Sequence, residues 1–268
     1  MANFFEQVRN SRIFDLSQPM YPGIPHFPSH PPFLFTLNKL HGEFVNPGGG
    51  SSSSETITLG GHVGTHIDAL NHFSCSGKLF GGAVPCQSAA GGVTPHSVDT
   101  IEPVARRAVL FDVAGEEGVD ALPPDFAITP KHLESIEAKH RICVEAGDVV
   151  LIRTGWAKHW DDSKYFVTAN TGGAVTGPGP EKPAAEWLSH RRVFAAGSDT
   201  LCFERVPSAS MPVHVHLLVE SGIHIIENLN LDGLAAAGIH EFLFIAAPLK
   251  IRGGTGSPLR PIAIVPAN

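Results

Sequence analysis

The chain has 268 residues, of which 43% are hydrophobic and 17% are charged, and its formal net charge is −7 with histidine counted as neutral. This composition is typical of a globular protein with a substantial core, and we expect one domain over residues 1–268. A mildly acidic chain with 19 Lys and Arg has no electrostatic reason to bind nucleic acid. No segment approaches the roughly 18 apolar residues that span a bilayer, so we expect no membrane partner either.

The amino terminus and the cysteines bear on the compartment. Residues 1–9 do not combine a basic segment with a following apolar run, so the sequence predicts no secretory signal and a cytoplasmic location. The four cysteines, Cys75, Cys86, Cys143 and Cys202, form no Cys-x-x-Cys pair and are too few for a disulfide framework. We therefore expect reduced and mostly buried thiols.

Short extended segments dominate the first third of the chain, and strands and helices are mixed after it. Apolar and β-branched residues predict strands at 12–16, 33–37, 55–59, 108–113, 149–154, 192–196, 223–226, 242–246 and 261–265. Helices are predicted at 130–139 behind the N-cap Thr129, at 183–188, and at 213–220 before Gly222. This mixture indicates an α/β fold with a mixed sheet and packed helices.

A glycine- and serine-rich run extends from Gly48 to Ser54. It has almost no side chain to bury, so the sequence predicts a mobile linker. Because the run comes shortly before a cluster of histidines, a lid over a functional site is the alternative.

Three histidines and one aspartate lie within eleven residues: His62, His66, Asp68 and His72. In a continuous strand His62 and His66 would lie about 13 Å apart. In a continuous helix Asp68 would point about 200° away from His66. A bend at Gly64, followed by an extended stretch to Asp68, would bring two imidazoles and one carboxylate together. Such a set, with open coordination positions, suits a catalytic Zn²⁺ or Mn²⁺ ion.

The ligand types alone leave other interpretations open. Solvated loop histidines would need no metal, although the glycine-flanked His-x3-His-x-Asp spacing argues against them. Two histidines and one carboxylate also hold iron in oxygenases. The His-Glu-x-x-His pattern of zinc proteases is absent, because Val63 occupies the glutamate position.

Residues 61–73, GHVGTHIDALNHF, resemble the HxGTHxDxxxH signature of the cyclase-like family of metal-dependent hydrolases, which includes bacterial kynurenine formamidases and isatin hydrolases. The likeness covers most of the chain in the same order, at 15–23, 147–156, 178–188, 198–200, 212–214, 226–229 and 248–258. It implies a swivelling β/β/α fold, a small-molecule substrate, and a homodimer or homotetramer whose subunits contribute to each other's sites.

The resemblance also assigns roles. His62, His66 and Asp68 match metal ligands, and His72 matches the acid–base group. His214 and Glu227 match positions that complete a second metal site in kynurenine formamidases. The segment before His72 lacks the proline of many formamidases, and the closing segment 250–258 is closer to isatin hydrolases. We therefore expect one ordered ion, with His214 bonded to the substrate or its water.

The implied reaction is hydrolysis of a carbon–nitrogen bond, in an isatin-like lactam or imide or in an aryl formamide, through a water activated by Mn²⁺ or Zn²⁺. Phe73 and Trp156 are candidate aromatic walls for a planar substrate, and each is equally compatible with a place in the core. Tyr21 and Phe27, on the proline-rich opening loop, are candidates to cover a partner subunit's site. A metal-dependent oxygenase or lyase and a non-catalytic metal-binding protein are the alternatives.

Overall fold

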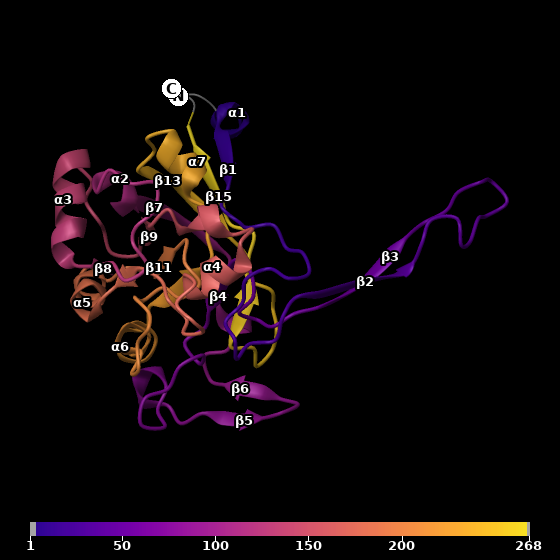
Figure 1. Ribbon diagram of the computed structural model, residues 1–268, viewed down its shortest axis with the longest axis horizontal. Coiled ribbons are helices and arrows are strands. Elements are labelled where there is room, and N and C mark those ends of the chain that lie inside the picture. Colours follow the sequence, from indigo (N-terminus) through magenta and orange to yellow (C-terminus); the bar gives the residue numbers. More distant parts are fainter. Residues whose placement is uncertain (1–3, 267–268) are drawn as a thin grey trace.

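The computed structural model describes residues 4–266 and has a nine-stranded mixed sheet at its centre (Figure 1). The strands follow the order β1-β15-β13-β7-β9-β11-β12-β4-β14. Their bounds are β1 Arg12–Asp15, β15 Ile262–Val265, β13 Glu241–Ala246, β7 Val104–Asp112, β9 Val149–Arg153, β11 Ala195–Ser198, β12 His224–Glu227, β4 His66–Asp68 and β14 Gly256–Pro258. Smaller pairs are β2 Leu34–Lys39 with β3 Ser54–Thr58, β5 Cys86–Ser88 with β6 Gly92–Thr94, and β8 Ala127–Ile128 with β10 Gly179–Pro180.

The middle of the sheet consists of the parallel strands β7, β9, β11 and β12. Side chains alternate between the two faces of a strand, so an apolar run supplies two cores. On β7, Val109 and Phe111 enter one core, whereas Ala108 and Leu110 enter the other. At the end of this parallel group, β12 pairs antiparallel with β4, and Glu227 lies directly opposite His66.

One face of the sheet is covered by α3, α5, α6 and η4 (Figure 1). Pro130 occupies the first turn of α3, and the backbone N–H of Thr129 donates to His132 Nδ1 at 2.9 Å. The opposite core includes Leu234 of α7 and Phe244 of β13. The helices are α1 Phe4–Asn10, α2 Val113–Glu116, α3 Pro130–His140, α4 Ser163–Thr168, α5 Lys182–His190, α6 Pro212–His214 and α7 Asp232–Ala236. Shorter or tighter turns are η1 Phe80–Gly82, η2 Val98–Thr100 and η3 Trp156–His159, and η4 Val215–Ser221 is a π-helix.

Strands β2 and β3 form a long hairpin that projects far from the sheet (Figure 1). We call residues 34–58 the arm. The run from Gly48 to Ser54 lies at the distal part of the arm rather than beside the histidine cluster that follows it in the sequence. In this structure the run therefore does not cover the histidine cluster of its own chain.

The α/β fold class with a mixed sheet is confirmed, and several details differ from the sequence-based expectation. The strand expected at 192–196 starts only at Ala195, because Arg192 adopts a left-handed backbone conformation with φ 57°. The helix expected at 213–220 begins one residue earlier and continues as a π-helix, and Gly222 ends it with φ 69°. The expectation of mostly buried cysteines is wrong, since three thiols are exposed and only Cys202 is buried. Within residues 4–266, no helix combines the length and apolarity needed to cross a membrane.

Candidate metal centre and substrate cavity

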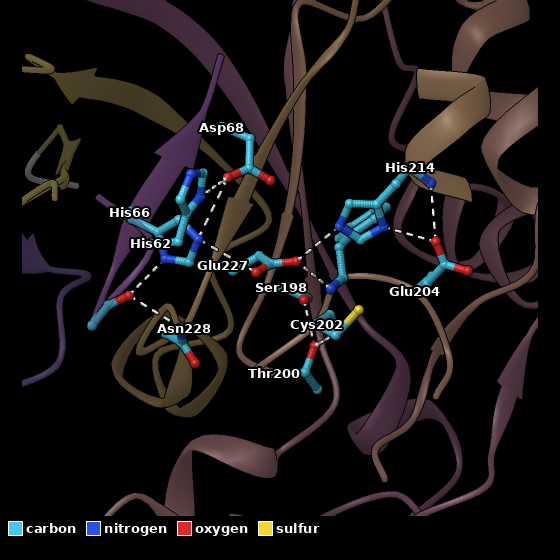
Figure 2. A network of polar contacts seen from close by, with 12 residues as sticks. His62, His66, Asp68, Ser198, Thr200, Cys202, Glu204, His214, Glu227 and Asn228 are labelled. Carbon is cyan, nitrogen blue, oxygen red and sulfur yellow. Dashed lines mark hydrogen bonds and ion pairs between the residues drawn. The ribbon is translucent and has the colours of Figure 1, made fainter. Parts of the chain in front are cut away.

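A bend at Gly64 brings the histidine motif together. Gly64 has φ 68°, and the chain after it is extended as β4. His62 Nδ1 lies 2.7 Å from Asp68 Oδ1, and His66 Nε2 lies 3.5 Å from the same oxygen (Figure 2). All three side chains are buried. The bend and the extended stretch predicted from the sequence are both present.

Glu227 joins this cluster from the neighbouring strand β12. Its Oε2 lies 3.4 Å from His66 Nε2, and its Oε1 lies 3.4 Å from His214 Nε2. The same Oε1 accepts a hydrogen bond from the backbone N–H of Phe203 at 2.7 Å. Glu227 is therefore bonded to the backbone at the end of its strand, and its carboxylate lies between two imidazoles (Figure 2).

Hydrogen bonds orient the imidazoles. His66 Nδ1 lies 2.8 Å from the carbonyl oxygen of Gly64, which can only accept, so Nδ1 carries a proton and Nε2 faces the carboxylates of Asp68 and Glu227. The same carbonyl accepts a hydrogen bond from Asn228 Nδ2 at 3.1 Å. His62 Nε2 lies 2.9 Å from Thr255 Oγ1. A histidine whose second nitrogen is fixed in this way is typical of metal ligands.

A buried carboxylate oxygen of the cluster lacks a hydrogen-bond partner. Asp68 Oδ2 accepts no hydrogen bond from any residue between 4 and 266. An unpaired buried carboxylate oxygen is costly, and a bound cation would satisfy it. Three overlapping groups bring ligand atoms within 4.8 Å of one another: His62, Asp68 and His72; His66, Asp68 and Glu227; and Cys202, His214 and Glu227. The donor set therefore fits a divalent ion.

The pKa values show how charge is distributed in the cluster. Burial alone would raise the pKa of Asp68, but neighbouring imidazoles, His72 foremost, hold it well below its ordinary value. Burial also opposes ionisation of Glu227, but hydrogen bonds from His214 and His66 lower its pKa to about 2. Burial lowers the pKa of His72 to about 3. The cluster thus combines two carboxylates with a neutral His72 at pH 7.

A cavity of about 300 Å³ opens beside the cluster. It is lined by Phe27, Ser29, His30, His62, His72, Phe73, Leu201, Cys202, Ser208, Met211, His214 and Glu227. Phe73 packs near His72 and His214, with ring centroids 5.7 and 5.3 Å away. Phe27 lines the cavity of its own chain, so it does not need a second subunit to reach a site.

The other two predicted aromatic residues lie away from the cavity lining. Trp156 is 1% exposed, belongs to a separate core cluster, and donates its indole N–H to the carbonyl of Phe166 at 3.0 Å. We therefore assign Trp156 to the core. Tyr21 packs against that same core cluster, and its hydroxyl donates to Asp161 Oδ1 at 2.8 Å in its own chain.

The structure separates His214 from its neighbour His216, which the sequence could not do. His216 lies 2.8 Å from Ser189 and 2.8 Å from Glu220, outside the cavity lining. His214 faces the cavity because α6 turns it toward Glu227 (Figure 2).

Three site residues were missed by the sequence analysis. Glu204 lies 2.7 Å from His214 Nδ1, Cys202 lines the cavity, and His30 lies 5.2 Å from the His62 ring. None of them belongs to the histidine motif. The chain has 15 histidines, but this number does not say which of them lie together, and it gives no signal for Glu204 or Cys202.

Comparisons with known proteins show the family to which this chain is similar. A family model described as a putative cyclase matches residues 14–205. The isatin hydrolase of Roseibium aggregatum is 33% identical to this chain over 214 residues, 78% of this chain and 74% of that protein. The kynurenine formamidase of Bacillus cereus is 26% identical over 258 residues, 95% of this chain and 98% of that protein.

Solved structures show the same likeness. The crystal structure of a novel cyclase has a TM-score of 0.83 and 29% identity, covering 96% of this chain and 88% of that chain. An isatin hydrolase bound to the product analogue thioisatinate has a TM-score of 0.76 and 26% identity, covering 97% and 94%. The chain belongs to the cyclase family, as its histidine motif indicates.

Proposed function

We propose that this chain opens the ring of an isatin-like cyclic amide by hydrolysing its carbon–nitrogen bond. The observation that carries the proposal is the cavity, in which Phe27 and Phe73 share the lining with His72 and Glu227. Its volume of about 300 Å³ suits a small planar bicyclic molecule. The likeness to isatin hydrolase supports the same substrate class.

The broader activity rests on family membership. The chain is a metal-dependent hydrolase of carbon–nitrogen bonds, as its similarity to isatin hydrolase and kynurenine formamidase and its cluster of ligand atoms indicate. An aryl formamide is the second candidate substrate, because the formamidase likeness spans 95% of the chain. The helices are unlike the nearly all-β fold expected of an oxygenase with this ligand set, and neither that alternative nor a non-catalytic scaffold has support among these relatives.

We assign one divalent ion, Mn²⁺ or Zn²⁺, to His62, His66 and Asp68, with Glu227 beside them. Imidazole and carboxylate oxygen are ligands that both metals accept. A divalent ion bound there would lower the pKa of a water molecule toward neutrality and polarise the amide carbonyl. The unpartnered Asp68 Oδ2 supports this assignment.

The side chains of the cavity supply the rest of the reaction. His72 is neutral and lines the cavity, so it can take a proton from the attacking water and return it to the departing nitrogen. Phe27 and Phe73 can pack on a planar ring and exclude water from it. His214 Nε2 faces the same cavity and can bond to the substrate or its water.

The arm supports assembly as a homodimer or homotetramer. Phe35 and Ile57 lie directly opposite each other on β2 and β3, so they share one face, and they are 44% and 50% exposed. Near the tip, Phe44 is 66% exposed. A two-stranded hairpin is marginally stable alone in water, so a partner covering its apolar face would stabilise it. A second copy of the chain is the partner that the family resemblance implies.

The test is a substrate screen with the purified chain and added Mn²⁺ or Zn²⁺. Isatin, N-formylkynurenine and simple cyclic imides are compared by kcat/KM. We expect the highest value for isatin or a close analogue. Faster hydrolysis of N-formylkynurenine would transfer the assignment to the formamide, and no hydrolysis of any amide with either metal would refute the function.

A further inference from the structure

Glu204 is a buried carboxylate that, among residues 4–266, contacts His214 through hydrogen bonds. Its side chain is 2% exposed. Its Oε2 accepts the backbone N–H of His214 at 3.0 Å and lies 2.7 Å from His214 Nδ1 (Figure 2). One oxygen therefore holds both the backbone and the ring of the same histidine.

This double contact fixes how the ring is presented. A carboxylate only accepts hydrogen bonds, so Nδ1 of His214 carries a proton and points at Glu204. The opposite nitrogen, Nε2, then faces Glu227 and the cavity. The Gly64 carbonyl does the same for His66, so both imidazoles present Nε2 to the two oxygens of Glu227.

The loop that carries Glu204 is held close to its neighbour strand. A Cβ at Gly179 would meet the backbone of Phe203, Glu204 and Arg205, so only glycine allows this approach. A buried carboxylate is costly, and its burial is accounted for by the charge-assisted hydrogen bonds that it accepts. The close packing of its loop against Gly179 and its hydrogen bonds to His214 therefore fix the position of Glu204.

We propose that Glu204 is the positioning residue for His214, and that its reach rather than its charge holds Nε2 toward the reacting groups. The proposal deepens the proposed function, on which it rests, because His214 serves the substrate or metal of that site. The alternative is that Glu204 only anchors the start of α6 through the backbone N–H of His214.

Two substitutions separate reach from charge. Glu204→Gln keeps an oxygen that can accept both contacts but removes the charge. Glu204→Asp keeps the charge but withdraws the oxygen by one methylene. Glu181→Gln is the matched control, because Glu181 pairs with Arg205 at 3.0 Å, next to Glu204, and is part-exposed.

The measurements are kcat and KM, and the His214 Nδ1–H resonance in ¹H–¹⁵N spectra of the full chain. We expect Glu204→Asp to lower kcat by roughly 10–100-fold with little change in KM, and to lose the slowly exchanging Nδ1–H. Glu204→Gln and the control should keep the resonance and a kcat close to that of the parent, because the contact to Nδ1 remains.

The outcomes are decisive in both directions. A lowered kcat in Glu204→Gln with an unchanged kcat in Glu204→Asp would show that the charge of Glu204 matters. That result would overturn the proposal. A retained Nδ1–H in Glu204→Asp would also overturn it. Should the chain hydrolyse none of the screened amides, the proposed function fails, but the resonance still decides whether Glu204 orients His214.

Discussion

The imidazole rings of His62 and His72 stack in the wall of the cavity, with centroids 3.9 Å apart and planes inclined by 29°. Of these two rings, His62 is the one whose Nδ1 contacts the Asp68 carboxylate, at 2.7 Å. The stack thus places a proposed metal ligand against a proposed acid–base group. The two roles can be separated by substitution.

His72→Ala should keep the metal and lose most turnover, because acid–base help is typically worth about 10²–10⁴-fold. Metal content by elemental analysis and kcat are measured on the same preparation. The control is His190→Ala, because His190 is exposed at the end of α5, away from the cavity and the arm. Loss of metal from His72→Ala would instead make His72 a ligand.

Asp68→Asn should lose stoichiometric metal, because it removes the charge that three imidazoles surround and leaves a buried amide there. Elemental analysis after dialysis measures the metal, with Asp125→Asn, an exposed site, as the matched change. Activity of the parent should fall with a chelator and return with Mn²⁺ or Zn²⁺. Activity that ignores chelators in a metal-free protein would contradict the centre.

The number of ions is tested by titrating metal-free protein while activity is followed. We expect full activity at one equivalent per chain, because Asp68 and Glu227 are the carboxylates beside His66, whereas Glu204 is held by Nδ1 of His214 and does not face the ion. Activity that rises only with a second equivalent, and loss of that equivalent in Glu227→Gln, would show two ions.

Asp199 should make stability depend on pH. It is fully buried, and burial raises its pKa from 3.8 to about 6, although it accepts hydrogen bonds from Thr154 and Gly155. Between these two pKa values the unfolded chain has released the proton while the folded chain still holds it. The contribution of Asp199 to the free energy of unfolding therefore falls as pH rises from about 4 to about 6. The difference between the unfolded and folded pKa of Asp199 corresponds to about 3 kcal/mol in the free energy of unfolding.

The measurement is urea unfolding of the parent and of Asp199→Asn between pH 4 and pH 7. The stability difference between the two proteins should favour the parent most at pH 4 and shrink toward pH 6. The cost of placing an amide opposite two N–H donors is independent of pH, so it shifts the whole curve. A difference that does not change with pH would contradict the raised pKa.

Replacing Phe35 and Ile57 together by threonine should dissociate the assembly, because both lie on the apolar face of the arm. Sedimentation velocity measures the mass. Serine at Thr36 and Thr56, which pair on the other face, is the control. A parent chain that is strictly monomeric and fully active would remove the role of the arm.

The sequence was most informative where the chemistry is local. The bend at Gly64 was predictable because His62, His66 and Asp68 lie within seven residues, and neither a continuous strand nor a continuous helix brings all three together. The cyclase family was recognisable for the same reason, from one short motif.

Contacts between distant segments were not predictable. Glu204 meets His214 through a loop whose course depends on the sheet, and no local pattern distinguishes it from a surface glutamate. His30 reaches the cavity because the opening loop folds over it. Trp156 has a side chain suited to contact a planar substrate, but its indole N–H donates to the carbonyl of Phe166 within the core. The two strands of the arm were predicted, but their projection away from the sheet was not. The length of a hairpin does not specify the direction in which it leaves the domain.

The direct pairing of Glu227 with His66 across β12 and β4 limits changes in chain length. Side chains alternate along a strand, so a shift of one residue exchanges its two faces. Deleting one residue from the short connection between Gly222 and β12 would bring a neighbour of Glu227 opposite His66 and turn the carboxylate to the other face. Every functional residue would still be in the chain, yet the site would be lost. The length of this connection is therefore under tighter constraint than its composition.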